Sequence, residues 1–301
     1  MKLIAVLSLC ALVATTVVST EFLNQEDVRG AFLVSRPKEQ PKSGNTTGAR
    51  PNRKRPKPKQ PSGETKKTPD PADGVSGQTT PVKDNQKPVP INAPRIGIGL
   101  TLFMRDSNGL AIRTDPSHVF QKGDRVRVLL ETNADGYLYI FNTTNNGPAV
   151  MLYPNHELDE AGNYLQAHVP FEIPSSLAAE ERLRWLVFDE NAGDERLFFV
   201  FSREPLSSVP LEEDLISFCR DNKDACPWRP STDVWSAIQK EMAQPLKTDK
   251  AKRYGVAETP REQQATSRGL GLAKDDPEPS LIMMASSNSP TLVTTLDLIH
   301  K

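Results

Sequence analysis

The sequence predicts a mainly β protein: an antiparallel β-sandwich, either Ig-like or an open barrel, with two short C-terminal helices and a long disordered linker. Residues 120–155 hold three apolar or alternating runs, separated by Asn-Ala-Asp-Gly and Asn-Asn-Gly. Those two groups are typical of turns that require a positive φ. About seven such short runs lie between residues 95 and 210, whereas the flanking segments have very different compositions.

The first 20 residues have the pattern of a secretory signal peptide. Met1-Lys2 is a short positive start, residues 3–18 form a mostly apolar run without a charge, and Ser19-Thr20 provides small residues for cleavage. The apolar run of about 16 residues is shorter than the roughly 20 that a membrane-spanning helix needs. We therefore expect export with cleavage, and an uncleaved signal anchor is the alternative.

Residues 21–94 are predicted to be a disordered, basic, Pro-rich linker. Between residues 36 and 94 there are 12 prolines and 13 Lys or Arg against 5 Asp or Glu, and there is no Leu, Met, Phe, Tyr or Trp. Such a segment cannot bury enough apolar surface to offset the entropy lost on ordering. Residues 21–35 contain a few apolar side chains, which could dock on the folded domain or on a partner. The linker charge suits an anionic cell-wall polymer, and export argues against nucleic acid.

The sandwich domain is expected at residues 95–210. Period-two alternation, Gly- and Asn-containing turns and β-branched or aromatic residues mark its strands. In chain order the expected strands are 96–104, 110–112, 125–131, 137–141, 149–153, one within 162–173, 184–188 and 197–202. In the strand at 137–141, Leu138 and Ile140 are expected to face the core.

Beyond the sandwich the pattern becomes helical. Residues 211–245 are predicted to be a helical extension with helices at 211–219 and 233–243, the second capped by Ser231 or Thr232. Residues 246–280 are charged and weakly apolar, which predicts a flexible segment. Residues 281–301 are expected to pack on the sandwich, with a strand at 291–299 that pairs beside 96–104.

A row of aromatic residues is the only candidate binding site in this sequence. Tyr137, Tyr139 and Phe141 share one face of a strand, and Tyr153 ends a later strand. Tyrosine is favoured at interfaces because its ring is apolar and its hydroxyl is polar. The row is therefore interpreted either as a platform for a peptide or glycan, or as a surface packed under the C-terminal helices.

No catalytic residues, metal site or cofactor are predicted. The sequence contains no Gly-x-Ser-x-Gly, phosphate-binding loop or His-Glu-x-x-His motif, and its four histidines lack metal-ligand spacing. Cys219 and Cys226 are expected to form a disulfide, because an exported chain meets an oxidising compartment. The acidic cluster Asp189, Glu190, Asp194 and Glu195 is interpreted as a solvated turn.

Five motif pieces, in this order and spacing, resemble an uncharacterised bacterial domain family. They are Phe120-x-x-Gly123-Asp124-x-Val126, Asp135-Gly136-Tyr137-Leu138-Tyr139, Leu152-Tyr153-Pro154-Asn155, Phe171-x-Ile173-Pro174 and Gly193-x-Glu195. The resemblance covers residues 96–210 and implies an exported or envelope protein. It carries over no catalytic residue, because no activity is agreed for that family.

Together these features predict a non-catalytic exported bacterial envelope protein, a binding or structural module tethered by the basic linker. Its expected partner is an envelope protein or an anionic cell-wall polymer, in the periplasm or outside the cell. It would contact the membrane only if the signal is uncleaved. The alternatives are an envelope-polymer hydrolase, which perturbed carboxylates lining a cleft would support, and a signal-anchored adaptor that spans the periplasm.

Overall fold

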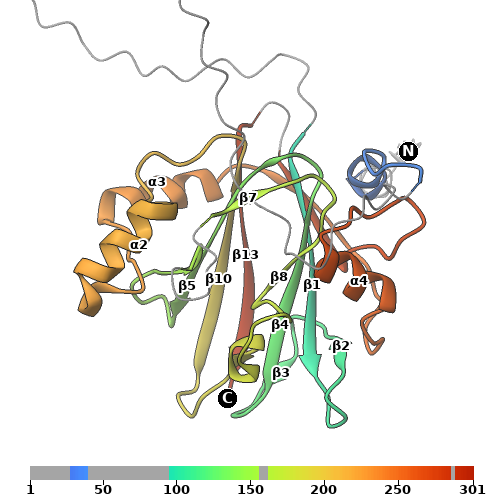
Figure 1. Cartoon of the computed structure of the whole chain (residues 1–301), viewed down its shortest axis with the longest axis horizontal. Coiled ribbons are helices and arrows are strands. Elements are labelled where there is room, and N and C mark those ends of the chain that lie inside the picture. The colour runs from blue at the N-terminus through green and yellow to red at the C-terminus, as the bar shows by residue number, and fades with distance from the viewer. Residues whose placement is uncertain (1–27, 40–94, 156–161, 286–288) are drawn as a thin grey trace, which may run out of the picture.

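A computed structural model describes residues 28–39, 95–155, 162–285 and 289–301. Within these ranges the chain forms two β-sheets packed against each other, with helices on opposite outer sides (Figure 1). The predicted mainly β sandwich is confirmed, and neither sheet closes into a barrel. The predicted signal at residues 1–20 and residues 40–94 of the predicted linker lie outside the described residues.

The first sheet, sheet A, has seven described strands in the order β11–β12–β1–β4–β8, with β2 beside β1 and β9 beside β4. All of its pairs are antiparallel. The strands are β1 (Gly97–Arg105), β2 (Ala111–Arg113), β4 (Arg125–Thr132), β8 (Phe171–Ile173), β9 (Leu186–Val187), β11 (Leu246–Lys250) and β12 (Leu281–Ala285).

The second sheet, sheet B, has six described strands in the order β3–β13–β10–β5–β6, with β7 beside β5. Only β3 runs parallel to its neighbour β13, and the other pairs are antiparallel. The strands are β3 (Val119–Phe120), β5 (Gly136–Thr144), β6 (Val150–Tyr153), β7 (Tyr164–Leu165), β10 (Gly193–Ser202) and β13 (Thr291–His300).

The main core lies between the two sheets. Leu138 and Ile140 of β5 are buried there, as predicted, together with Leu130 of β4 and Phe199 of β10. Side chains alternate along each strand, so every second residue enters this layer. Burying one large aliphatic side chain contributes about 1.5–3 kcal/mol. The core is therefore the main source of stability for the arrangement of the two sheets.

Both predicted helices are present, on the outer face of sheet B. They are α2 (Glu212–Asp221) and α3 (Thr232–Met242), and the Ser231 hydroxyl accepts a hydrogen bond from Val234 N at the start of α3. A third helix, α4 (Pro260–Arg268), was not predicted. Figure 1 shows α4 and the helical residues 28–33 on the opposite side of the molecule from α2 and α3. Two short 3-10 helices are η1 (Glu181–Arg184) and η2 (Lys223–Ala225).

The C-terminal strand differs from its predicted position. β13 lies between β10 and β3 in sheet B, and it is β12 that pairs with β1 in sheet A. The reason is that β13 has apolar contacts on both faces: Leu292 and Leu296 enter the main core, while Val293 packs on the other face of the sheet, which otherwise carries mostly polar residues. A strand of that composition fits the interior of a sheet covered on both sides.

Two segments predicted to be flexible are partly ordered. Residues 28–39 lie in the range assigned to the linker, but they pack on sheet A with Phe32 fully buried, which agrees with the expectation that the apolar side chains of residues 21–35 could dock on the folded domain. Residues 246–280 contain β11 and α4. Few apolar side chains hold them, but buried ion pairs do, including Arg113–Glu262 and Arg261–Asp276. The partners of these charges are too distant in the chain for composition to reveal them.

Candidate functional site

The outer face of sheet A carries an unusual row of buried charges. Arg127 and Glu131 alternate with Val126, Val128 and Leu130 along β4, so their side chains point away from the main core. Arg127 is 5% and Glu131 3% exposed. Buried charges are costly unless they are paired. Residues 28–39 cover the Glu131 end of this row, and the other end opens into a cavity.

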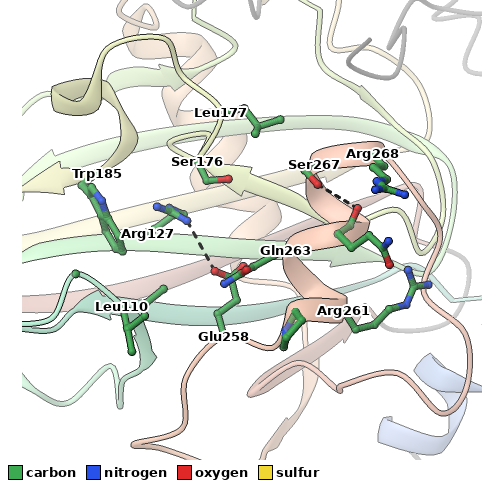
Figure 2. A pocket seen from close by; sticks show the side chains of 14 residues that line it. Leu110, Arg127, Ser176, Leu177, Trp185, Glu258, Arg261, Gln263, Ser267 and Arg268 are labelled. Carbon is green, nitrogen blue, oxygen red and sulfur yellow. Dashed lines mark hydrogen bonds and ion pairs between the residues drawn. The ribbon is translucent and has the colours of Figure 1, made fainter. Parts of the chain in front are cut away.

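That cavity has a volume of about 750 Å³ and lies between sheet A and α4 (Figure 2). Its lining mixes apolar groups with groups that form hydrogen bonds. The lining residues are Gly109, Leu110, Ala111, Arg127, Ser176, Leu177, Trp185, Glu258, Pro260, Arg261, Gln263, Gln264, Ser267 and Arg268. A volume in this range is typical of small-molecule sites.

Arg127 is the fixed cation of the cavity. Its guanidinium carbon lies 4.1 Å from the centre of the Trp185 ring, and Nη1 is 3.2 Å from Oε1 of Glu172. Glu172 is 2% exposed, and its second oxygen accepts a hydrogen bond from Ser176 N. Both oxygens of Glu172 are therefore occupied by the protein, and its charge neutralises Arg127.

Glu258 is the acid of the cavity. Its side chain is close to Arg127, with Oε2 4.0 Å from Nη1, as the dashed line in Figure 2 marks. Burial, followed by the nearby negative charge of Glu172, raises the pKa of Glu258 to about 8, although Arg127 opposes this shift. A protonated Glu258 can also donate a hydrogen bond to Glu172, which favours the neutral form. At pH 7 Glu258 is thus mainly a neutral carboxylic acid.

One oxygen of Glu258 has no hydrogen-bond partner among the described residues. Oε1 is buried and unpaired, and the whole residue is only 8% exposed. An unsatisfied buried polar atom costs about 1–3 kcal/mol, so a partner that satisfies it stabilises the site. Glu258 lines the cavity, and this oxygen lies in the cavity wall, shielded from solvent.

Local structure holds Glu258 in this position. Its backbone N–H donates to the Ala111 carbonyl oxygen of β2 at 2.8 Å, and α4 begins directly after it. Thr259 and Glu262 form a capping box, with Pro260 in the first turn of the helix. Glu262 also pairs with Arg113 of β2. The helix start and β2 are thereby joined, and Glu258 lies between them.

Arg261 supplies a second unpaired polar group. Its Nε donates to Asp276 at 3.0 Å and its Nη2 to the Gly271 carbonyl oxygen at 2.8 Å, whereas the buried Nη1 has no partner in the described part of the chain. Arg268 is exposed at the rim. With Arg127 balanced by Glu172, Arg261 by Asp276 and Glu258 neutral, Arg268 leaves the cavity with a positive charge.

The prediction that the aromatic row forms an exposed binding platform is wrong. Tyr137, Tyr139 and Phe141 are between 0 and 7% exposed, because α2 and α3 cover that face of sheet B. Tyr139 also accepts a hydrogen bond from Leu206 N at 2.8 Å, and Trp235 packs edge-on against Phe141. The alternative, packing under the C-terminal helices, is therefore correct for these three. Tyr153 lies on the other face, in the main core.

The predicted disulfide is present between Cys219 at the end of α2 and Cys226, with an S–S distance of 2.02 Å. In the acidic cluster, Asp189 accepts hydrogen bonds from Asn191, which lower its pKa, and Asp189 and Glu190 lie at the surface. Among the described residues no group of three or more His, Cys, Asp or Glu is placed to hold a metal ion.

No residue of the cavity was predicted from the sequence to belong to a functional site. Glu258 and Arg261 belong to a segment predicted to be flexible, and nothing in their neighbourhood marks a site. The one local signal is Thr259-Pro260-x-Glu262, a pattern typical of a helix start. That pattern could have predicted α4, but not the cavity beside it.

Comparison with known proteins identifies one family. Residues 119–205 match the model of a domain of unknown function, DUF4384, which confirms the resemblance to an uncharacterised domain family over these residues. The matched part contains Arg127, Glu172 and Trp185 but not Glu258 or α4. No curated protein and no solved structure matches the chain. No helix in the described ranges is long and apolar enough to cross a membrane.

Proposed function

We propose that this protein is an exported, non-catalytic envelope module that binds an anionic cell-wall polymer through the cavity between sheet A and α4. The signal-like residues 1–20 and the Cys219–Cys226 disulfide support export. The net charge of +8 that Lys, Arg, Asp and Glu give residues 36–94 supports an anionic partner. The signal-anchored adaptor and an envelope-protein partner are the rival forms of this proposal.

The observation that carries the proposal is the buried, neutral Glu258 in the cavity wall, which has an unpaired oxygen. A neutral carboxylic acid carries no charge that repels an anion, whereas a carboxylate does. The unpaired Nη1 of Arg261 is a hydrogen-bond donor in the same cavity wall, and the exposed Arg268 supplies a positive charge at the entrance. A carboxylate-bearing sugar or peptide unit matches these donors.

A second candidate function is hydrolysis of the same polymer. The observation that favours it is the raised pKa of Glu258, because a general acid needs a proton at neutral pH. Hydrolysis by paired carboxylates also needs a second group that attacks the substrate or activates water. Glu172 is the nearest such group, but Arg127 and Ser176 occupy its two oxygens. We therefore favour binding over catalysis.

Blocking the cavity tests the proposal. Gln264 is an exposed residue of α4 that lines the cavity, so Gln264→Trp places a large ring there. Gln239→Trp, at an exposed position of α3, is the matched control. The full-length protein is titrated with soluble peptidoglycan fragments by calorimetry. We expect saturable binding for the wild type and for Gln239→Trp, and at least about tenfold weaker binding for Gln264→Trp. Equal affinities for all three proteins would exclude the cavity as the site.

The same fragments separate binding from hydrolysis. Release of reducing ends or free amines is followed over hours with the wild type and with Glu258→Gln. The binding proposal expects no release above the buffer control from either protein. Turnover by the wild type that disappears in Glu258→Gln would establish the hydrolase instead.

A further inference from the structure

Residues 28–39 occupy a groove on the outer face of sheet A. Val28 and Phe32 pack on Ile282 and Met284 of β12, and Phe32 is fully buried. The groove exists because β1 has glycines there: a Cβ on Gly97 would lie 3.0 Å from Cδ2 of Phe32. Figure 1 shows this helical segment beside the sheet, near α4. The residues of β1 thus make room for an aromatic ring from another part of the chain.

Arg36 fills a socket at the end of this groove. Its side chain has 0% exposure and donates five hydrogen bonds. Nε and Nη2 bind the two oxygens of Glu131 at 2.8 and 2.6 Å. The carbonyl oxygens of Ala273, Asp276 and Pro277 accept the other three, at 3.0–3.1 Å. Every donor of the guanidinium is therefore satisfied, which a lysine could not reproduce.

Two further polar contacts fix the segment. Arg29 pairs with Asp249 of β11 at 2.8 Å and with Glu278 at 2.7 Å. Ser35 Oγ lies 2.8 Å from Nε2 of His168, whose Nδ1 lies 2.7 Å from Glu131. Side chains, and not a shared β-ladder, make most of these contacts. Buried aromatic and arginine anchors with polar contacts around them are typical of a protein–peptide interface.

From this geometry we propose that the groove is a peptide-binding site whose ligand is the chain's own segment 28–39, held reversibly. Val28, Phe32 and Arg36 are spaced four residues apart, which defines the recognition pattern as two apolar anchors followed by an arginine. The 55 residues from 40 to 94 separate this ligand from β1. Because the segment belongs to the same chain, its docking is intramolecular, so it docks in its own molecule even when its intrinsic affinity is modest.

The row Ser35–His168–Glu131 also has the spacing of a nucleophile, a base and an orienting acid. Here both oxygens of Glu131 already bind Arg36. Ser35 Oγ also lies 2.9 Å from the Phe32 carbonyl oxygen, within the docked segment itself. Ser35 and Arg36 arrive together with that segment, so we assign the row to docking.

A peptide in trans tests the proposal on the full-length chain. The variant Phe32→Ala/Arg36→Ala weakens the chain's own segment and leaves the groove intact. A labelled peptide with the sequence of residues 28–39, VRGAFLVSRPKE, is titrated into it, and anisotropy is measured. We expect saturable binding to this variant and at least about tenfold weaker apparent binding to the wild type, where the chain's own segment competes.

Matched peptides test which side chains are recognised. Phe32→Ala is compared with Val34→Ala, which is 65% exposed in the docked segment, and Arg36→Lys with Lys38→Ala, which is also exposed. The Phe32 and Arg36 changes should weaken binding at least about tenfold, and the Val34 and Lys38 changes less than threefold.

Several results would overturn the proposal. They are absence of binding to the double variant, equal binding to variant and wild type, or an Arg36→Lys peptide that binds like the unchanged one. Melting curves confirm that the double variant is folded. If it is not, the single variant Arg36→Lys replaces it, because this change keeps both apolar anchors, and the same ranking of peptides is required. Since Glu258 and the cavity are unchanged, failure here leaves the proposed polymer binding unaffected.

Discussion

The neutral Glu258 makes a sharp prediction about stability and pH. In Glu258→Gln the amide resembles the protonated acid in shape and still donates a hydrogen bond. The substitution therefore removes the titration at this position while keeping the packing beside Arg127 and β2. We expect the variant to match the wild type in acid and to be more stable than the wild type in mild alkali.

The magnitude follows from the pKa. Folding raises the pKa of Glu258 from an ordinary value of 4.5 to about 8. Because a tenfold change in proton affinity corresponds to about 1.4 kcal/mol, this contribution is on the order of 5 kcal/mol. The folded protein binds the proton more tightly than the unfolded chain. The stabilisation is therefore fully present below about pH 4.5 and is lost as the pH rises through about 8.

Urea unfolding of wild type and Glu258→Gln from pH 5 to 9 measures this contribution. Taking the difference in unfolding free energy between the two proteins removes the contribution of all groups that titrate identically in both. It should grow in favour of the variant to several kcal/mol by pH 9, whereas Glu241→Gln, a change of an exposed glutamate, should show no such trend. Parallel pH profiles for wild type and Glu258→Gln would mean that Glu258 is not protonated in the folded state.

Three further predictions concern the fold. Replacing Cys219 and Cys226 by serine should lower the free energy of unfolding by about 2 kcal/mol, because the bridge closes a loop of seven residues; free thiols in native protein purified from an oxidising compartment would refute it. Leu138→Asp should cost several kcal/mol, whereas Val187→Asp at a 52% exposed site should change melting little; similar melting of both would contradict the assigned faces. Deleting residues 289–301 should cause unfolding or aggregation, because β13 lies between β10 and β3; a monomeric truncation that melts like the wild type would show that β13 is dispensable.

Local patterns were sufficient to predict the strands of the sandwich. Leu138 and Ile140 alternate with Tyr139, and Asn-Asn-Gly at residues 145–147 marks a turn, so β5 and its neighbours could be placed from short-range signals. The order of the strands was not predictable in the same way. An apolar strand such as β13 fits several sheet positions, and its pairing with β10 depends on packing between residues about 100 apart.

The candidate site depends on contacts that no local pattern contains. Glu131 lies 95 residues from Arg36, and Arg127 lies 45 residues from Glu172. In sequence, the two β4 charges are indistinguishable from those of a solvent-facing strand surface. The aromatic row showed the opposite problem: Tyr137 to Phe141 suit either a binding face or a packed face, and only α2 and α3 decide between them.

The most direct test of the proposed function is a pH-resolved titration of the full-length protein with soluble peptidoglycan fragments. Neutral Glu258 does not repel the anionic ligand, whereas its carboxylate does. Wild-type affinity should therefore fall at least about tenfold as the pH rises from 6 to 9, with its midpoint near the pKa of about 8, and Glu258→Gln should retain its affinity throughout. Binding that is independent of pH in the wild type, or that falls equally in Glu258→Gln, would show that the cavity acid does not contact the ligand.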